Sequence, residues 1–146
     1  MSRKLARETA FRALFQLDFN HGEIDEREIY EANAIGTAIE AAAEFDAKDN
    51  LSEDNLKYVG ETVKNVMTRL EEIDEIIKSH LKKNWTLSRL ASADRNILRL
   101  AVYELKFAED KIPVGVAINE AVELAKKYGT DDSKSFVNGV LSAIAK

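Results

Sequence analysis

The sequence predicts an all-α protein, a compact bundle of six or seven helices. Three observations support this prediction. The 146 residues contain a single Pro and only six Gly. Good helix formers are abundant, and apolar residues recur every three or four positions. No stretch alternates polar and apolar residues as a half-buried strand would. We therefore expect one helical domain covering residues 1–146.

The first half of the chain predicts three or four helices. The first runs over residues 3–19 and ends near the run Asn20-His21-Gly22, whose glycine suits a left-handed cap. A second covers 25–45, and the polar run at 46–50 reads as a loop. Ser52 begins a third helix. Its apolar stripe continues to residue 81, either without interruption or as a separate helix after a break near Arg69.

The second half predicts three more helices after an interruption at residues 84–86. Ser92 suits the N-cap of a helix whose wide apolar face, over 97–105, should make it central. Pro113 fits the first turn of the next helix, and Gly129 fits its C-terminal cap. The last helix should start at Thr130 or Asp131 and run to the C-terminus.

The absence of cysteine excludes disulfides, thiolate metal sites and a thiol nucleophile, and it suits a reducing compartment. The N-terminus is charged from Arg3 onward and lacks the apolar core of a signal peptide. No stretch approaches the roughly 20 apolar residues that span a bilayer. We therefore expect a cytoplasmic protein with no membrane partner.

The net charge of −5 argues against a nucleic-acid partner only until its distribution is considered. Residues 21–61 hold twelve acids and three bases, a local charge of −9. The segments before and after each carry a charge of +2. A positive face is therefore compatible with the acidic total.

Catalytic patterns are missing from the sequence. Only His21 and His80 could act as bases at neutral pH, and neither a phosphate-binding Gly-rich loop nor a nucleophile-elbow serine occurs. Asp18 precedes His21 by three residues, but this pair has no partner motif of the kind a two-metal bundle needs. The sequence predicts no enzyme, no catalytic residue, no metal and no cofactor.

The first helix has two distinct faces. Ala6, Ala10, Ala13, Leu14 and Leu17 share one of them, and we expect that face to be buried. Lys4, Arg7, Phe11 and Phe15 share the other, which mixes cations with rings as a surface that binds phosphates and stacks bases does. The alternative is that these rings enter the core and the cations only extend to solvent.

Four features of the second half, one cluster and three single residues, each allow two interpretations. The arginines Arg89, Arg95 and Arg99 flank Asp94 at a helix start, either as a salt-bridged turn or as a docking edge. Asn119 is expected to be part-buried and to tie down backbone rather than bind a ligand. Gly139 lies inside a helix, which predicts a close approach there, most simply by a neighbouring helix. Phe136 is either a core residue or an exposed stacking ring.

Five strings in register give the sequence its resemblance to a known family. They are Ala6-Arg7-Glu8 with Ala13-Leu14-Phe15, Asp94-Arg95 through Tyr103-Glu104-Leu105, Ile112-Pro113, Val116 to Lys126, and Phe136-Val137-Asn138-Gly139-Val140-Leu141. Together they resemble the NusB family over residues 3–17 and 86–141. The middle of the chain matches only in its helical periodicity.

The resemblance implies an all-α domain of two packed helical subdomains that binds boxA RNA of ribosomal RNA transcripts together with the ribosomal protein NusE. It also implies a role in the RNA polymerase antitermination complex, and homodimers are a further possibility. Carried over position by position, the implied RNA contacts are Arg3, Lys4, Arg7, Asp132, Lys134 and Phe136. The implied partner contacts are Phe15, Asp94 and Arg99.

Two departures from the family qualify these expectations. The N-terminal basic cluster is sparser than in some relatives, which weakens the case for RNA binding without a partner. The acidic segment 21–61 matches least. Two other functions stay open: the RNA-binding domain of a ribosomal RNA cytosine methyltransferase, although no Rossmann-like domain follows before Lys146, and a self-associating structural module.

Overall fold

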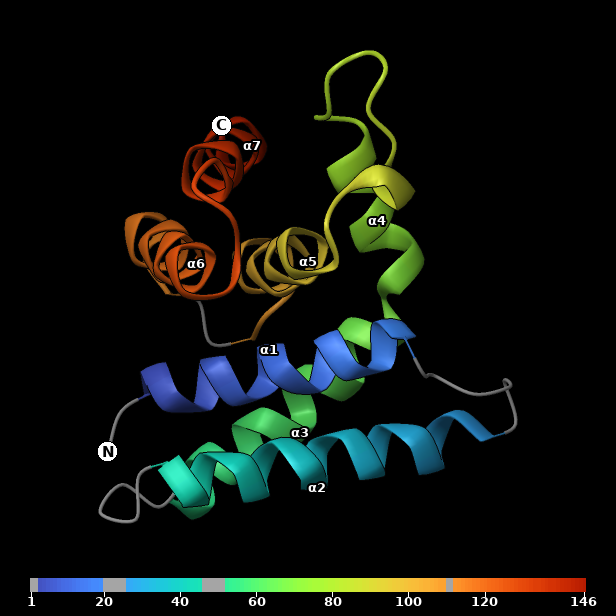
Figure 1. The fold of residues 1–146 in the computed structure, drawn as a ribbon, viewed down its shortest axis with the longest axis vertical. Coiled ribbons are helices and arrows are strands. Elements are labelled where there is room, and N and C mark those ends of the chain that lie inside the picture. The colour runs from blue at the N-terminus through green and yellow to red at the C-terminus, as the bar shows by residue number, and fades with distance from the viewer. Residues whose placement is uncertain (1–2, 20–25, 46–51, 110–111) are drawn as a thin grey trace. The chain divides into compact units, whose positions relative to one another are not determined.

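Seven α-helices and one short 3-10 helix make up the computed structural model, which describes residues 3–19, 26–45, 52–109 and 112–146 (Figure 1). No strand occurs within these ranges, so the predicted all-α class is confirmed. The chain divides into two compact units, Met1–Thr68 and Arg69–Lys146. Each unit is described by itself below.

The first unit contains α1 (Arg3–Phe19), α2 (Arg27–Phe45) and α3 (Glu53–Thr68), and α1 packs against the other two. The face of α1 that was expected to be buried is at most 2% exposed along its length. Alanines spaced four residues apart line the buried side of α2 and permit close packing. On α3 the buried stripe consists of Val59, Val63 and Val66.

The ends of these helices largely follow the prediction. The Asn55 backbone N–H donates to Ser52 Oγ at 3.2 Å, so Ser52 caps α3 as expected. α3 ends at Thr68 and α4 (Leu70–Lys78) begins two residues later, because Arg69 leaves the helical conformation with φ −103° and ψ 18°. The apolar stripe is therefore carried by two helices. The predicted cap at 20–22 and loop at 46–50 lie outside the described residues.

In the second unit, α4, α6 (Val114–Tyr128) and α7 (Ser133–Ala145) all pack against α5 (Ser92–Lys106). Ile97, Leu98 and Val102 of α5 have no exposed surface. The prediction that this helix is central is confirmed. Its first residue is Ser92 and the N-cap position falls on Ala91, one residue from the expected cap.

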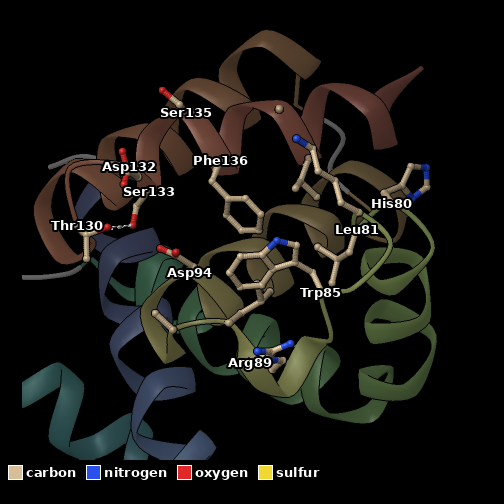
Figure 2. A pocket seen from close by; sticks show the side chains of 15 residues that line it. His80, Leu81, Trp85, Arg89, Asp94, Thr130, Asp132, Ser133, Ser135 and Phe136 are labelled. Carbon is tan, nitrogen blue, oxygen red and sulfur yellow. Dashed lines mark hydrogen bonds between the residues drawn. The ribbon is translucent and has the colours of Figure 1, made fainter.

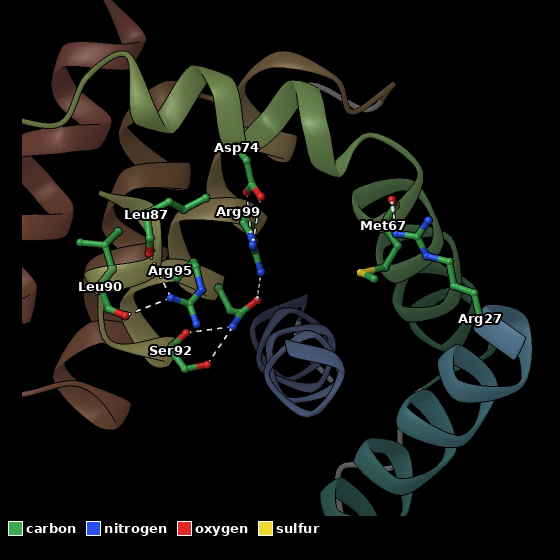
Figure 3. Close-up of polar contacts among 9 residues, drawn as sticks. Arg27, Met67, Asp74, Leu87, Leu90, Ser92, Arg95 and Arg99 are labelled. Atoms are coloured by element: carbon green, nitrogen blue, oxygen red, sulfur yellow. Dashed lines mark hydrogen bonds and ion pairs between the residues drawn. The ribbon is translucent and has the colours of Figure 1, made fainter. Parts of the chain in front are cut away.

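Two arginines of α5 hold neighbouring elements in place (Figure 3). The Arg99 guanidinium binds the Asp74 carboxylate of α4 through two parallel hydrogen bonds, Nε to Oδ1 at 2.8 Å and Nη2 to Oδ2 at 3.0 Å. Arg95 Nη1 donates to the carbonyl oxygens of Leu87 and Leu90, each at 3.0 Å. These two carbonyls bracket the 3-10 helix η2 (Leu87–Arg89), which is thereby held against α5.

The α6–α7 connection differs from the prediction. Gly129 ends α6 as expected, but its backbone is extended, with φ −96° and ψ −167°, rather than left-handed. A Cβ there would collide with the Ser133 side chain and lie 2.8 Å from the Ala125 carbonyl oxygen, so a close approach requires the glycine. The last helix begins at Ser133, later than predicted. The residues before it form a turn, in which Ser133 Oγ accepts a hydrogen bond from the Thr130 backbone N–H at 2.9 Å.

Two local predictions for α6 and α7 were wrong. Asn119 is exposed rather than part-buried. At Gly139 no neighbouring helix approaches, since nothing lies within 4 Å of the position that a Cβ would take. Both predictions assumed that an unusual residue in a helix faces a neighbouring helix, whereas no helix covers either residue.

Candidate nucleic-acid interface

A cavity of about 680 Å³ opens in the second unit beside α7 (Figure 2). Its walls come from the segment between α4 and η2, from η2 itself, from the start of α5, and from the α6–α7 connection with the adjoining part of α7. Leu90 and Val140, both less than 10% exposed, contribute apolar surface to it. The cavity thus combines an apolar lining with polar groups from several elements, as ligand sites commonly do.

Two aromatic rings face the cavity. Figure 2 shows the Phe136 ring, carried by α7, and the Trp85 indole, carried by the loop before η2, turned toward one another. Trp85 is 53% exposed, which is unusual for such a large apolar surface. Phe136 is half-buried, so its ring both packs and remains accessible.

The loop that carries Trp85 has a defined conformation. The backbone N–H of Trp85 donates to the Lys82 carbonyl oxygen at 2.9 Å, and this hydrogen bond closes a turn. Within that turn Asn84 has φ 121°, in the region that L residues rarely adopt, and its carbonyl oxygen accepts from Arg89 Nη1 at 3.2 Å. Strained backbone of this kind persists where the surroundings hold it, often at functional sites.

Charged groups line the same cavity. Lys82 and Arg89 are exposed cations on its lining, whereas Asp94 and Asp132 supply carboxylates. Asp94 Oδ1 is buried and has no hydrogen-bond partner among the described residues. An acceptor in that condition favours a ligand that carries an N–H or O–H donor.

The residues predicted to bind RNA are divided between the two units. In the second unit, Asp132 and Phe136 line the cavity, and Lys134 lies between them on the exposed side of the α7 start. In the first unit, Lys4 and Arg3 are exposed, and Arg3 Nη2 lies 3.2 Å from Asp54 Oδ2. The structure thus gathers part of the predicted set around one cavity.

Arg7 and Phe11 are more deeply buried in the first unit than residues that contact RNA are expected to be. Arg7 is 6% exposed and Phe11 is 1% exposed. For Phe11 the alternative interpretation, entry into the core, is correct. Arg7 stays a predicted RNA contact, but its burial leaves less of the guanidinium available to a phosphate than at Lys4.

The predicted partner residues have three different environments. Phe15 is 36% exposed and lies between Phe11 and Phe19, with ring centroids 6.0 and 5.2 Å away. Phe19 is 70% exposed, so the rings of Phe15 and Phe19 form an apolar surface on α1. Asp94 lines the cavity, and Arg99 is only 9% exposed because it pairs with Asp74.

The acidic second helix has one perturbed carboxyl. Burial raises the pKa of Glu31 above the usual glutamate value of 4.5, although the nearby Arg27 and Lys64 lower it and Glu28 raises it further. Arg27 Nε lies 3.6 Å from Glu31 Oε1, while Arg27 Nη2 donates to the Met67 carbonyl oxygen at 3.0 Å (Figure 3). These contacts connect α2 to the end of α3 and give Glu31 a structural role.

Sequence reasoning missed Trp85 and the cavity. The run at 84–86 was interpreted only as an interruption between helices, although the single Trp of the chain in a polar loop is a signal of a functional surface. Within the described ranges, no cluster of three or more His, Cys, Asp or Glu could hold a metal ion. Likewise, no helix in those ranges is long and apolar enough to cross a bilayer.

Comparisons with known proteins agree over nearly the whole chain. Residues 4–146 match the model of the NusB family. A transcription antitermination protein NusB from Bacillus subtilis is 44% identical over 144 residues, which cover 99% of this chain and 95% of the relative. Among solved structures, T. maritima NusB superimposes with a TM-score of 0.83 at 34% identity, covering 99% of this chain and 91% of that one. A complex of the antitermination factors NusB and NusE with dsRNA contains a chain that superimposes with a TM-score of 0.79 at 35% identity, covering 98% and 95%.

Proposed function

The chain belongs to the NusB family, and from this premise we propose that it is a transcription antitermination factor. It is a non-catalytic, cytoplasmic adaptor that binds single-stranded boxA-type RNA of ribosomal RNA transcripts together with NusE and acts in the RNA polymerase antitermination complex. One observation carries the RNA and NusE parts of the proposal: the similarity, over 98% of this chain, to a chain of a NusB–NusE–dsRNA complex.

We assign the RNA contacts to two groups of residues. Arg3, Lys4 and Arg7 supply positive charge from α1, and Asp132, Lys134 and Phe136 lie at the start of α7. Exposed cations bind phosphates, and an accessible ring stacks on a base. Lys4 is exposed, and the half-buried Phe136 ring lines the cavity, so both are suitable for mutation.

We assign the NusE contacts to Phe15, Asp94 and Arg99. Exposed rings at Phe15 and Phe19 support a protein contact on α1, since a part-exposed aromatic pair is typical of interface anchors. Arg99 is the least direct of the three because its guanidinium already binds Asp74. A variant at Arg99 would disturb the fold as well as the partner surface.

Fluorescence anisotropy with labelled boxA-like RNA tests the proposal. We expect tighter binding of boxA-like RNA than of a scrambled sequence, with affinity rising when NusE is added. Double-stranded RNA of the same sequence serves as a comparison, since the similar complex contains dsRNA. Equal binding of boxA-like and scrambled RNA, with and without NusE, would refute the proposal.

The exposed rings on α1 also favour one alternative, self-association through the same surface. Light scattering over a concentration range measures it, and RNA competition shows whether a dimer hides the RNA surface. The methyltransferase alternative is less favoured, because the B. subtilis relative is an antitermination protein that this chain covers over 95% of its length.

A further inference from the structure

We propose that Trp85 and Phe136 form a clamp for one unstacked base of single-stranded RNA, which enters the cavity beside α7. This inference rests on the proposed function and assigns RNA a second ring, Trp85, that the sequence analysis did not include. The two rings come from elements about fifty residues apart in the chain and are turned toward one another in Figure 2.

The cavity has the groups that a nucleotide requires, in a suitable arrangement. The rings offer faces on which a base can stack. Lys82 and Arg89 are exposed on the lining and can neutralise the phosphates on either side.

The same groups argue against other occupants. An apolar peptide segment would cover the exposed side chains of Lys82 and Arg89 and remove their charges from water. The combination of two rings and two exposed cations therefore favours a nucleotide over an apolar peptide.

The loop geometry supports a preformed clamp. The Trp85–Lys82 turn, the strained Asn84 and the Arg89 hydrogen bond to Asn84 hold the indole away from the core. An exposed indole held in this way has already lost part of its conformational freedom, so less is lost when a base binds. Gly139, one turn after Phe136, adds no side chain to the cavity wall and keeps it open.

Trp85 provides a direct readout, because the chain has a single Trp. We expect boxA-like RNA to quench its emission along the same binding curve that anisotropy reports. Replacing the ring in Trp85→Leu should weaken RNA binding roughly 5- to 150-fold, the range for loss of one stacked base. Trp85→Phe keeps a ring and should lose less.

A second variant adds a large side chain on the cavity lining and leaves both rings in place. Gly139→Leu introduces a good helix former at a position with open space around it, and should abolish the quenching. Gly36→Leu is the matched control, since Gly36 is also helical, has nothing within 4 Å of its added Cβ and lies on α2 in the other unit. It should bind RNA as the unmodified protein does.

The outcomes separate this proposal from the function on which it rests. Preferential boxA binding with unchanged Trp85 emission and a neutral Trp85→Leu variant would refute the clamp and keep the antitermination factor. Quenching by any RNA without preference for boxA would keep the clamp and refute the boxA function. Quenching by NusE alone, with none by RNA, would refute the clamp and assign the cavity to the protein partner. Absence of RNA binding would refute both.

Discussion

The ion pair between Arg99 and Asp74 should be a main determinant of the stability of the second unit. It joins α4 to α5 through two parallel hydrogen bonds of 2.8 and 3.0 Å, and Arg99 Nη1 makes a third to Asn96 Oδ1 at 3.2 Å. The side chains of Arg99 and Asp74 are 11% and 20% exposed. Because water screens this pair little, its loss should have a larger effect than the loss of a surface ion pair.

The expected magnitude follows from this burial. Removing one partner of a buried pair destabilises by about 3 to 5 kcal/mol, because the other charge is left unpaired. Asp74 keeps some access to water, so Arg99→Met should lie near the lower end, about 3 kcal/mol. For a chain of this length that is a fall in Tm of roughly 6 to 12 °C. Asp74→Leu should cost a similar amount, since the part-buried Arg99 guanidinium then loses its carboxylate partner.

A double-mutant cycle measured by urea unfolding tests this reasoning. The variant carrying both Arg99→Met and Asp74→Leu should be more stable than the sum of the single losses predicts, because neither charge is left unpaired. The surface pair Lys57–Glu61, with side chains 73% and 62% exposed, is the control and should couple by less than about 1 kcal/mol. Single losses below about 1 kcal/mol at Arg99 and Asp74 would refute the reasoning.

The remaining predictions concern single positions. Lys4→Ala should flatten the plot of log affinity for boxA-like RNA against log salt by about one unit, and an unchanged slope would remove Lys4 from the interface. Gly129→Ala should destabilise by about 1 to 3 kcal/mol through its collision with Ser133, whereas Gly139→Ala should stabilise by up to about 1 kcal/mol, both measured by urea unfolding. Because burial raises the pKa of Glu31, the folded state binds its proton more tightly than the unfolded state does, and the resulting stability is present below pH 4.5 and lost as pH rises through the folded pKa. Glu31→Gln should therefore gain unfolding free energy relative to the unmodified protein as the pH rises from 4 to 7. A constant difference across this range would contradict the sign.

Local patterns were sufficient to predict most of the helices. The spacing of alanines and leucines from Ala6 to Leu17 identified the buried face of α1, since one helical face requires that period. Ser52 marked the start of α3 and Gly129 the end of α6, because helix capping and termination depend on residues that are close in sequence. The break at Arg69 could be suspected but not decided, because an apolar stripe continues in the same way through one helix or two.

Long-range pairing was beyond these patterns. Arg99 resembled a docking residue in sequence because it follows Asp94 and Arg95 at a helix start. Its partner Asp74 lies 25 residues earlier, and only the packing of α4 on α5 brings the two together. Similarly, the sequence could place Phe136 near the start of a helix, but it could not show that the loop carrying Trp85 reaches the same cavity.

The error at Gly139 has a physical consequence for the proposed clamp. A helical glycine destabilises by about 1 kcal/mol relative to alanine, and a close helix contact usually explains it. Here no such contact exists, because nothing lies within 4 Å of the position of an added Cβ. What the glycine does provide is an open cavity wall one turn from the Phe136 ring. If that space admits a base, Gly139→Leu should weaken RNA binding while leaving the fold intact, whereas a glycine without a function would tolerate the leucine in both respects.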